Sequence, residues 1–91
     1  MTDLDDRFAA AAAAVQELEE RPGNDELLRL YSLYKQGSEG DATGDRPGML
    51  DFVGRAKYDA WASLAGTSQD DAKAAYVELV ETLQSARGSQ A

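Results

Sequence analysis

Apolar residues recur every three to four positions in four separate stretches of this chain, and this spacing constrains the fold more than any other feature. Such a period places apolar side chains on one face of an α-helix, whereas a half-buried strand needs strict alternation, which is almost absent here. The pattern predicts an all-α fold, a four-helix bundle, formed as a single domain over residues 1–91. The predicted helices cover about residues 3–20, 24–38, 51–64 and 68–87.

Glycine and proline separate the four stretches. Pro22 ends the first stretch, and Gly37 and Gly40 are expected to end the second. The segment 37–48 is rich in glycine and is predicted to be a loop. Because it is long for a connection between helices of a small bundle, we expect it to have a role beyond joining them.

Capping residues support these boundaries. Asn24 is predicted as the N-cap of the second helix, since its side chain can accept from a free backbone N–H. Ser68 and Asp71 resemble a capping box at the start of the fourth helix. Gly88 is expected at the C′ position, just after that helix ends.

The composition excludes several classes of function. The net charge of −8 disfavours binding to nucleic acid or to anionic membranes, because both require a broad basic surface. The chain has no cysteine and no histidine, so it lacks thiolate chemistry and the usual base near neutral pH. An enzyme is therefore not expected, nor a metal site or a transmembrane segment. The acidic start lacks the features of a signal peptide, so we expect a soluble, cytoplasmic protein.

One predicted helix face carries residues that could bind a nucleotide. Tyr31, Tyr34 and Lys35 stand at positions i, i+3 and i+4, so a helix brings them to one side. Aromatic rings can stack on a base, and an ammonium group can pair with phosphate. Judged from these residues alone, the favoured interpretation is that the tyrosines lie in the core and the lysine lies in solvent. Lys57 could complete a phosphate site with Lys35, but sequence spacing leaves open whether the two meet.

Several segments in order resemble the acyl-CoA-binding protein family. Residues 31–36 read YSLYKQ, residues 46–52 read RPGMLDF and residues 56–61 read AKYDAW. Gly66-Thr67-Ser68 and Ala75-Tyr76 follow at suitable spacing, and the similarity covers about residues 4–87. The resemblance implies an up-down-down-up bundle in which the long loop joins the second and third helices. It also implies a monomer that binds fatty acyl-CoA without catalysis and without a further cofactor, and that could serve enzymes that use acyl-CoA.

The resemblance also implies roles for individual residues. The implied contacts to the CoA head are Tyr31, Tyr34, Lys35, Lys57 and Tyr76. The implied contacts along the acyl chain are Leu28 and Tyr58.

Among the positions that depart from the family pattern, three bear directly on the ligand. Gln16 and Val53 stand where lysine is common, and Tyr58 stands where tryptophan is usual. The two missing lysines motivate an alternative reading. In that reading the chain is a helical protein–protein adaptor that kept the fold and lost or weakened ligand binding.

Overall fold

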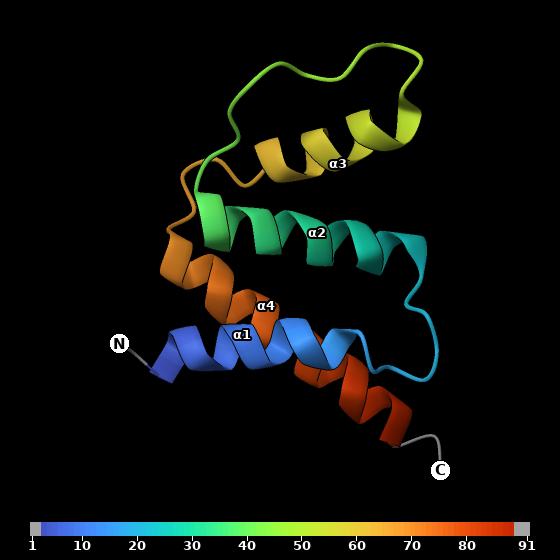
Figure 1. Ribbon diagram of the computed structural model, residues 1–91, viewed down its shortest axis with the longest axis vertical. Coiled ribbons are helices and arrows are strands. Elements are labelled where there is room, and N and C mark those ends of the chain that lie inside the picture. Colours follow the sequence, from blue (N-terminus) through green and yellow to red (C-terminus); the bar gives the residue numbers. More distant parts are fainter. Residues whose placement is uncertain (1–2, 89–91) are drawn as a thin grey trace.

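The computed structural model describes residues 3–88, and their side chains through residue 85. These residues form helices and connecting loops, and no strand occurs among them. The all-α prediction is therefore confirmed (Figure 1). The four helices are α1 (Asp3–Val15), α2 (Asn24–Glu39), α3 (Phe52–Ala62) and α4 (Gln69–Gly88).

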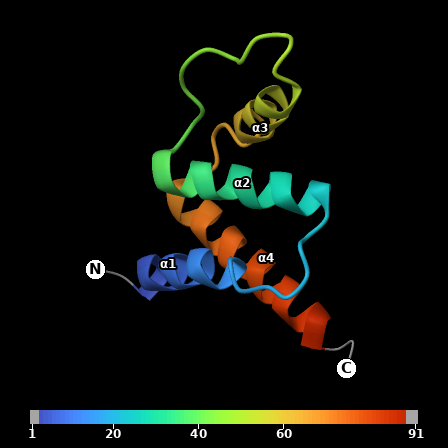
Figure 2. The ribbon, with the colours of Figure 1, turned by 45° about the vertical axis from the view of Figure 1, so that its right-hand side comes forward.

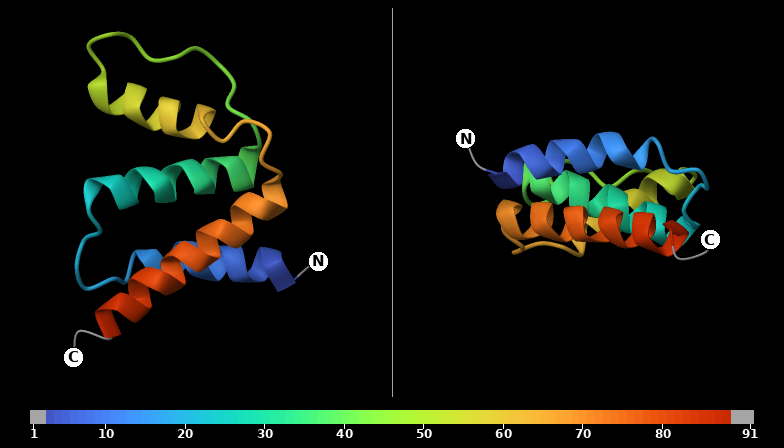
Figure 3. Two further views of the ribbon diagram at one scale, coloured as in Figure 1. Left: turned by 180° about the vertical axis from the view of Figure 1, so that it is seen from behind. Right: turned by 90° about the horizontal axis from the view of Figure 1, so that it is seen from below.

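The helices form a thin, flat array with α2 in its middle. α2 packs against α3 on one side and α4 on the other, and α1 packs across α4 (Figures 1 and 2). α1 and α4 run in one direction while α2 and α3 run in the opposite one, which is the expected up-down-down-up order. The molecule measures 42 × 33 × 17 Å, and its thinness is evident when it is seen from below (Figure 3).

The core lies where α2 and α4 meet α1. Phe8 of α1 contacts the rings of Tyr34 and Tyr76, with centroids 5.4 and 5.2 Å away. The buried hydrophobic residues of this core recur at the helical spacing seen in the sequence. They are Phe8, Ala11, Leu30, Leu33, Tyr76, Val77 and Val80.

α1 ends at Val15, so the prediction that this helix continues to residue 20 is wrong. The chain leaves the helix in a turn, in which the N–H groups of Gln16 and Glu17 donate to carbonyls three residues back. The last turn of α1 holds no basic residue, and several glutamates follow it. Negative charge at a helix C-terminus opposes the helix dipole, so this composition disfavours continuing the helix.

The boundaries of α2 also differ from expectation. Gly23, and not Asn24, is the N-cap, and its N–H donates to the Glu26 carboxylate at 2.9 Å. Gly37 lies inside the helix, which ends at Gly40 with a φ of 86°. At Gly37 an added Cβ would lie 3.1 Å from Lys73 Cγ of α4 and 3.2 Å from the Phe8 ring, so the missing side chain lets these two side chains pack closely on α2.

Side chains cap the two remaining helices. Ser68 accepts from the Asp71 N–H at 3.0 Å, which confirms Ser68 as the cap of α4. Asp51 accepts from the Gly54 N–H at 2.9 Å and caps α3, which begins one residue later than expected. Gly88 lies within α4 rather than after its end.

The long loop between α2 and α3 is fastened to α3. The Trp61 indole donates to the Gly40 carbonyl at 2.8 Å, and the Tyr58 hydroxyl donates to the Gly44 carbonyl at 3.0 Å. Arg46 forms a bidentate pair with Asp59, with bonds of 2.8 and 2.7 Å. The loop therefore lies along the side of α3 that faces away from α4 (Figure 1).

Buried Gln36 joins α2 to both neighbouring loops. Its amide donates to the Asp41 carboxylate and to the Thr67 carbonyl, each at 2.8 Å. Asp41 also accepts from the Gly66 N–H at 3.0 Å. These bonds fix the ends of α2 and α3 relative to the start of α4. Within residues 3–88, no helix is both long and apolar enough to cross a membrane.

Candidate functional site

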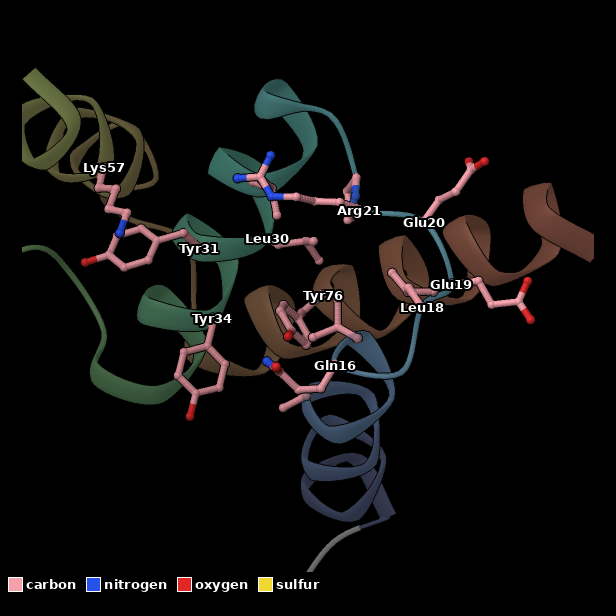
Figure 4. A pocket seen from close by; sticks show the side chains of 14 residues that line it. Gln16, Leu18, Glu19, Glu20, Arg21, Leu30, Tyr31, Tyr34, Lys57 and Tyr76 are labelled. Carbon is pink, nitrogen blue, oxygen red and sulfur yellow. The ribbon is translucent and has the colours of Figure 1, made fainter.

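A pocket of about 890 Å³ opens beside the middle of α2. We call it the tyrosine pocket. The end of α1, the loop that follows it, α2, α3 and α4 all contribute to its wall (Figure 4). Its lining residues are Ala12, Val15, Gln16, Leu18, Glu19, Glu20, Arg21, Pro22, Leu27, Leu30, Tyr31, Tyr34, Lys57 and Tyr76.

Lys57 of α3 reaches α2 in this pocket. Its ammonium lies 5.3 Å from the centre of the Tyr31 ring, within the range of a cation–π contact. Figure 4 shows the lysine side chain extending from α3 to that ring. The pocket therefore joins a cation and an aromatic surface that stand 26 positions apart in the sequence.

Tyr34 and Tyr76 form a second aromatic surface, backed by Phe8. The Tyr34 and Tyr76 centroids lie 5.8 Å apart with planes inclined at 58°. Tyr34 is 43 % exposed and can stack on a ligand, whereas Tyr76 is only 3 % exposed. Burial, together with the neighbouring Tyr34, raises the pKa of Tyr76. The Tyr76 hydroxyl therefore keeps its proton at neutral pH.

Lys35 lies outside the tyrosine pocket. Its ammonium sits 4.7 Å from the centre of the Trp61 ring and donates to the Glu39 carboxylate. The hydrogen bond to Glu39 raises the pKa of Lys35. The structure thus brings Tyr31, Tyr34 and Lys57 together, while Lys35 faces α3 and the C-terminal end of its own helix.

A second pocket of about 410 Å³ lies between the start of α2 and α3. We call it the apolar pocket, because five of its eight lining residues have hydrocarbon or aromatic side chains. Leu28, expected along an acyl chain, lies here. The full lining is Arg21, Asn24, Leu27, Leu28, Phe52, Val53, Ala56 and Lys57.

Three residues line both pockets and connect them. They are Arg21, Leu27 and Lys57. Two of the three are cations, so positive charge is concentrated where the aromatic and apolar surfaces meet. These surfaces are complementary to an amphiphile that carries an anionic group between a flat ring system and a hydrocarbon chain.

Tyr58 lines neither pocket. Its hydroxyl is bonded to the loop carbonyl of Gly44, and its ring packs edge-on against Trp61 with centroids 6.3 Å apart. The structure therefore places Tyr58 among the contacts that hold the long loop, apart from Leu28. Its contact with an acyl chain stays a prediction.

Sequence reasoning missed Arg21, Leu27 and Leu30 as pocket residues. The two leucines share a helical face with Tyr31 and Tyr34, so the signal was present in the spacing. Arg21 carried no such signal, because it lies in the irregular segment before Pro22.

Acidic residues also border the tyrosine pocket. Glu19 and Glu20 line it, but their carboxylates point away from Lys57, while the Arg21 guanidinium extends toward α2 (Figure 4). The side of the pocket nearest α3 is thus its more positive side. Among residues 3–88 there is no group of three acidic, histidine or cysteine side chains that could hold a metal ion.

Comparisons with known proteins agree with this architecture. The family model described as Acyl CoA binding protein matches residues 5–80. The chain is 55 % identical over 76 residues to "Acyl-CoA-binding protein homolog 1" of Caenorhabditis elegans, covering 84 % of this chain and 88 % of that one. It is 51 % identical over 76 residues to "Acyl-CoA-binding protein" of Dictyostelium discoideum, covering 84 % and 90 %.

Solved structures show the same fold. Acyl-CoA-Binding Protein 2 of Oryza sativa superimposes with a TM-score of 0.92 at 33 % identity, over 97 % of this chain and 98 % of that one. The yeast Acyl Coenzyme A Binding Protein gives a TM-score of 0.70 at 45 % identity, covering 86 % and 91 %. By its sequence match over most of its length and by its helical architecture, the chain belongs to the acyl-CoA-binding protein family.

Proposed function

We propose that this protein binds fatty acyl-CoA esters of medium to long chain non-covalently and carries or buffers them. The observation that carries the proposal is the junction of the two pockets, where Arg21 and Lys57 stand between aromatic and hydrocarbon surfaces. The chemical groups of acyl-CoA follow the same order: a flat base, several phosphates and a hydrocarbon tail. Family membership supports the same ligand.

The CoA head fits the tyrosine pocket. Tyr31 and Tyr34 offer ring faces for the base, and Lys57 and Arg21 offer charge to the phosphates. A charge-assisted hydrogen bond contributes about 1.5–3 kcal/mol. Lys35 reaches the same ligand if its side chain turns away from Glu39.

The acyl chain fits the apolar pocket, along Leu27 and Leu28. Each buried methylene contributes about 0.8 kcal/mol, so ten of them contribute roughly 8 kcal/mol before the cost of ordering the chain. The tail then supplies most of the affinity, and the head supplies recognition and orientation.

The role is binding and not catalysis. The polar groups described at the pocket junction, a lysine and an arginine, suit the recognition of an anion. Strong acidity favours solubility, which suits a carrier in the cytoplasm that delivers its ligand to enzymes that use acyl-CoA.

Isothermal titration calorimetry with acyl-CoA esters of graded length tests the proposal. Affinity should rise with chain length, free CoA should bind far more weakly, and free fatty acid should bind poorly because it lacks the head. Equal affinity for free CoA and a long-chain ester would refute the assignment of the two pockets.

A further inference from the structure

Four large apolar side chains stand in solvent around the start of α3. Met49 is 78 % exposed, Leu50 91 %, Phe52 75 % and Val53 67 %. Together with Tyr34 they are all of the large hydrophobic residues that are exposed in the described part of the chain. Isolated exposed apolar residues are ordinary, but a group of four in five positions marks an interaction surface. We call these four residues the apolar tip.

Local bonds give the apolar tip a defined backbone. The Asp51 N–H donates to the Gly48 carbonyl at 3.0 Å, and the Asp51 carboxylate caps α3 through the Gly54 N–H. Asp51 is thus turned back onto the helix. The backbone that carries the four apolar side chains is therefore held in a turn and a capped helix end.

The apolar tip continues the apolar pocket. Phe52 and Val53 line that pocket, whereas Met49 and Leu50 line neither pocket. The exposure of Met49 and Leu50 is therefore not explained by the proposed ligand. Two of the four tip residues, Phe52 and Val53, therefore belong to the wall of the apolar pocket as well.

We propose that the apolar tip docks transiently on the surface of an electrically neutral lipid bilayer. The tip lies at the start of α3, at a corner of the molecule far from α1 (Figures 1 and 2). A protruding corner can enter the interfacial layer of a bilayer. A stable protein–protein interface instead buries about 800 Å² on each partner, more than four side chains at one helix end provide.

The local charge favours this surface. The whole chain carries −8, but residues 49–57 contain one acid, Asp51, and two cations, Arg55 and Lys57. This end of the protein can therefore approach lipid phosphates, while the global charge opposes anionic bilayers. Docking through four side chains at a helix end is shallow and reversible, and it needs no membrane-spanning segment.

Docking of the tip would turn the entrance of the apolar pocket toward the bilayer. This consequence rests on the proposed function, because it assumes that the acyl chain occupies the apolar pocket. An acyl-CoA embedded by its tail in the bilayer could then enter the pocket without exposing the whole tail to water.

A Leu50→Trp variant tests docking directly. With phosphatidylcholine vesicles, the emission of the new tryptophan should shift to shorter wavelength and be quenched by phosphatidylcholine brominated on its acyl chains. The unmodified protein is the baseline, because its single tryptophan, Trp61, is buried and donates to the Gly40 carbonyl. Unshifted and unquenched emission would overturn the proposal.

Polar substitution separates docking from ligand binding. The Met49→Ser/Leu50→Ser variant should bind phosphatidylcholine vesicles about tenfold more weakly in co-sedimentation, because its tip buries less apolar surface. A matched control, Ala9→Ser/Ala13→Ser on exposed positions of α1, should bind vesicles like the unmodified protein. Phosphatidylglycerol vesicles should bind the unmodified protein more weakly than phosphatidylcholine vesicles do.

Calorimetry without vesicles keeps the two proposals distinguishable. The Met49→Ser/Leu50→Ser variant should keep its acyl-CoA affinity, since neither residue lines a pocket. If neither the unmodified protein nor the variants bind acyl-CoA, while vesicle binding is intact, the proposed function is refuted and docking still stands. Undiminished vesicle binding by the double variant would refute docking. Light scattering could instead show that the unmodified protein is a dimer and that this variant is not. That result would assign the tip to contact with a second copy and would also refute docking.

Discussion

The ammonium of Lys57 on α3 lies 5.3 Å from the centre of the Tyr31 ring on α2, and both residues line the tyrosine pocket. If the phosphates of acyl-CoA lie here, Lys57→Gln should weaken binding. The loss of one charge-assisted hydrogen bond costs about 1.5–3 kcal/mol, which is about tenfold to a hundredfold in Kd. Titration calorimetry with one long-chain ester measures this change.

Arg29→Gln is the matched control for Lys57→Gln. Arg29 lies on the same helix as Tyr31, is exposed and lines neither the tyrosine pocket nor the apolar pocket. The substitution removes the same unit of charge, so it reports the effect of net charge alone. Equal losses in the two variants would show that Lys57 acts only through the overall field of the protein.

Lys35 is paired with Glu39 before any ligand arrives. Exposed pairs four residues apart on a helix contribute about 0.3–0.5 kcal/mol. Glu39→Gln should therefore tighten acyl-CoA binding about twofold, because Lys35 no longer has to leave a partner. Lys35→Ala should weaken binding without unfolding the bundle.

A double-mutant cycle isolates the contribution of Lys35. In the Lys35→Ala background, Glu39→Gln should leave the calorimetric Kd unchanged, since no ammonium remains to be released. The emission of Trp61 provides a second readout, because the Lys35 ammonium lies over its ring. A gain in affinity from Glu39→Gln that persists without Lys35 would contradict this explanation.

Much of the fold could be predicted from the sequence because helical periodicity records which face of each segment is buried. The stripe in α4 through Tyr76 and Val80 is buried in the structure, as expected. The long loop was recognisable from its glycines. The end of α1 was less predictable, because Leu18 continues the apolar stripe although the chain has already left the helix.

The candidate site was only partly predictable for a different reason. Tyr31 and Tyr34 share a helix face, so their proximity follows from spacing alone. Lys57 belongs to another helix, and its place depends on how α3 packs on α2. Arg21 lies in irregular structure, where no periodicity applies. The partner of Lys35 could not be predicted, because several acidic residues are near it in the sequence.

Gln16 lines the tyrosine pocket just after α1 ends. Gln16→Lys should strengthen acyl-CoA binding, because it adds a cation beside the proposed phosphates. An exposed pair contributes about 0.2–1 kcal/mol, so Kd should fall by a factor of about 1.4 to 5. Gln84→Lys on an exposed position of α4 adds the same charge outside this pocket and should have a smaller effect. Equal gains would show a response to net charge only.

Asp41 links stability to acid pH. The hydrogen bond from Gln36, and then that from the Gly66 N–H, lower the pKa of the Asp41 carboxyl. A carboxylate with a lowered pKa in the folded state stabilises the protein above its unfolded pKa of about 3.9, and this contribution is lost as pH falls through the folded pKa. Asp41→Asn should therefore be less stable at neutral pH and converge with the unmodified protein in strong acid. Thermal unfolding followed by circular dichroism at several pH values measures the stability of both proteins. A stability difference that stays constant with pH would contradict the role assigned to the Asp41 carboxylate.

Gln36 is fully buried and donates to both Asp41 and the Thr67 carbonyl. Gln36→Leu keeps an apolar body in place but leaves these acceptors without their donor, which costs about 1–3 kcal/mol of unfolding free energy. For a domain of this size, each kcal/mol lowers the Tm by about 4–8 °C. Gln69→Leu is the matched control, because exposed Gln69 makes a single 3.2 Å bond to the Gly37 carbonyl and should cost far less. Similar Tm losses would mean that the Gln36 network does not hold the two loops to α2, since an exposed bond would then matter as much as a buried pair.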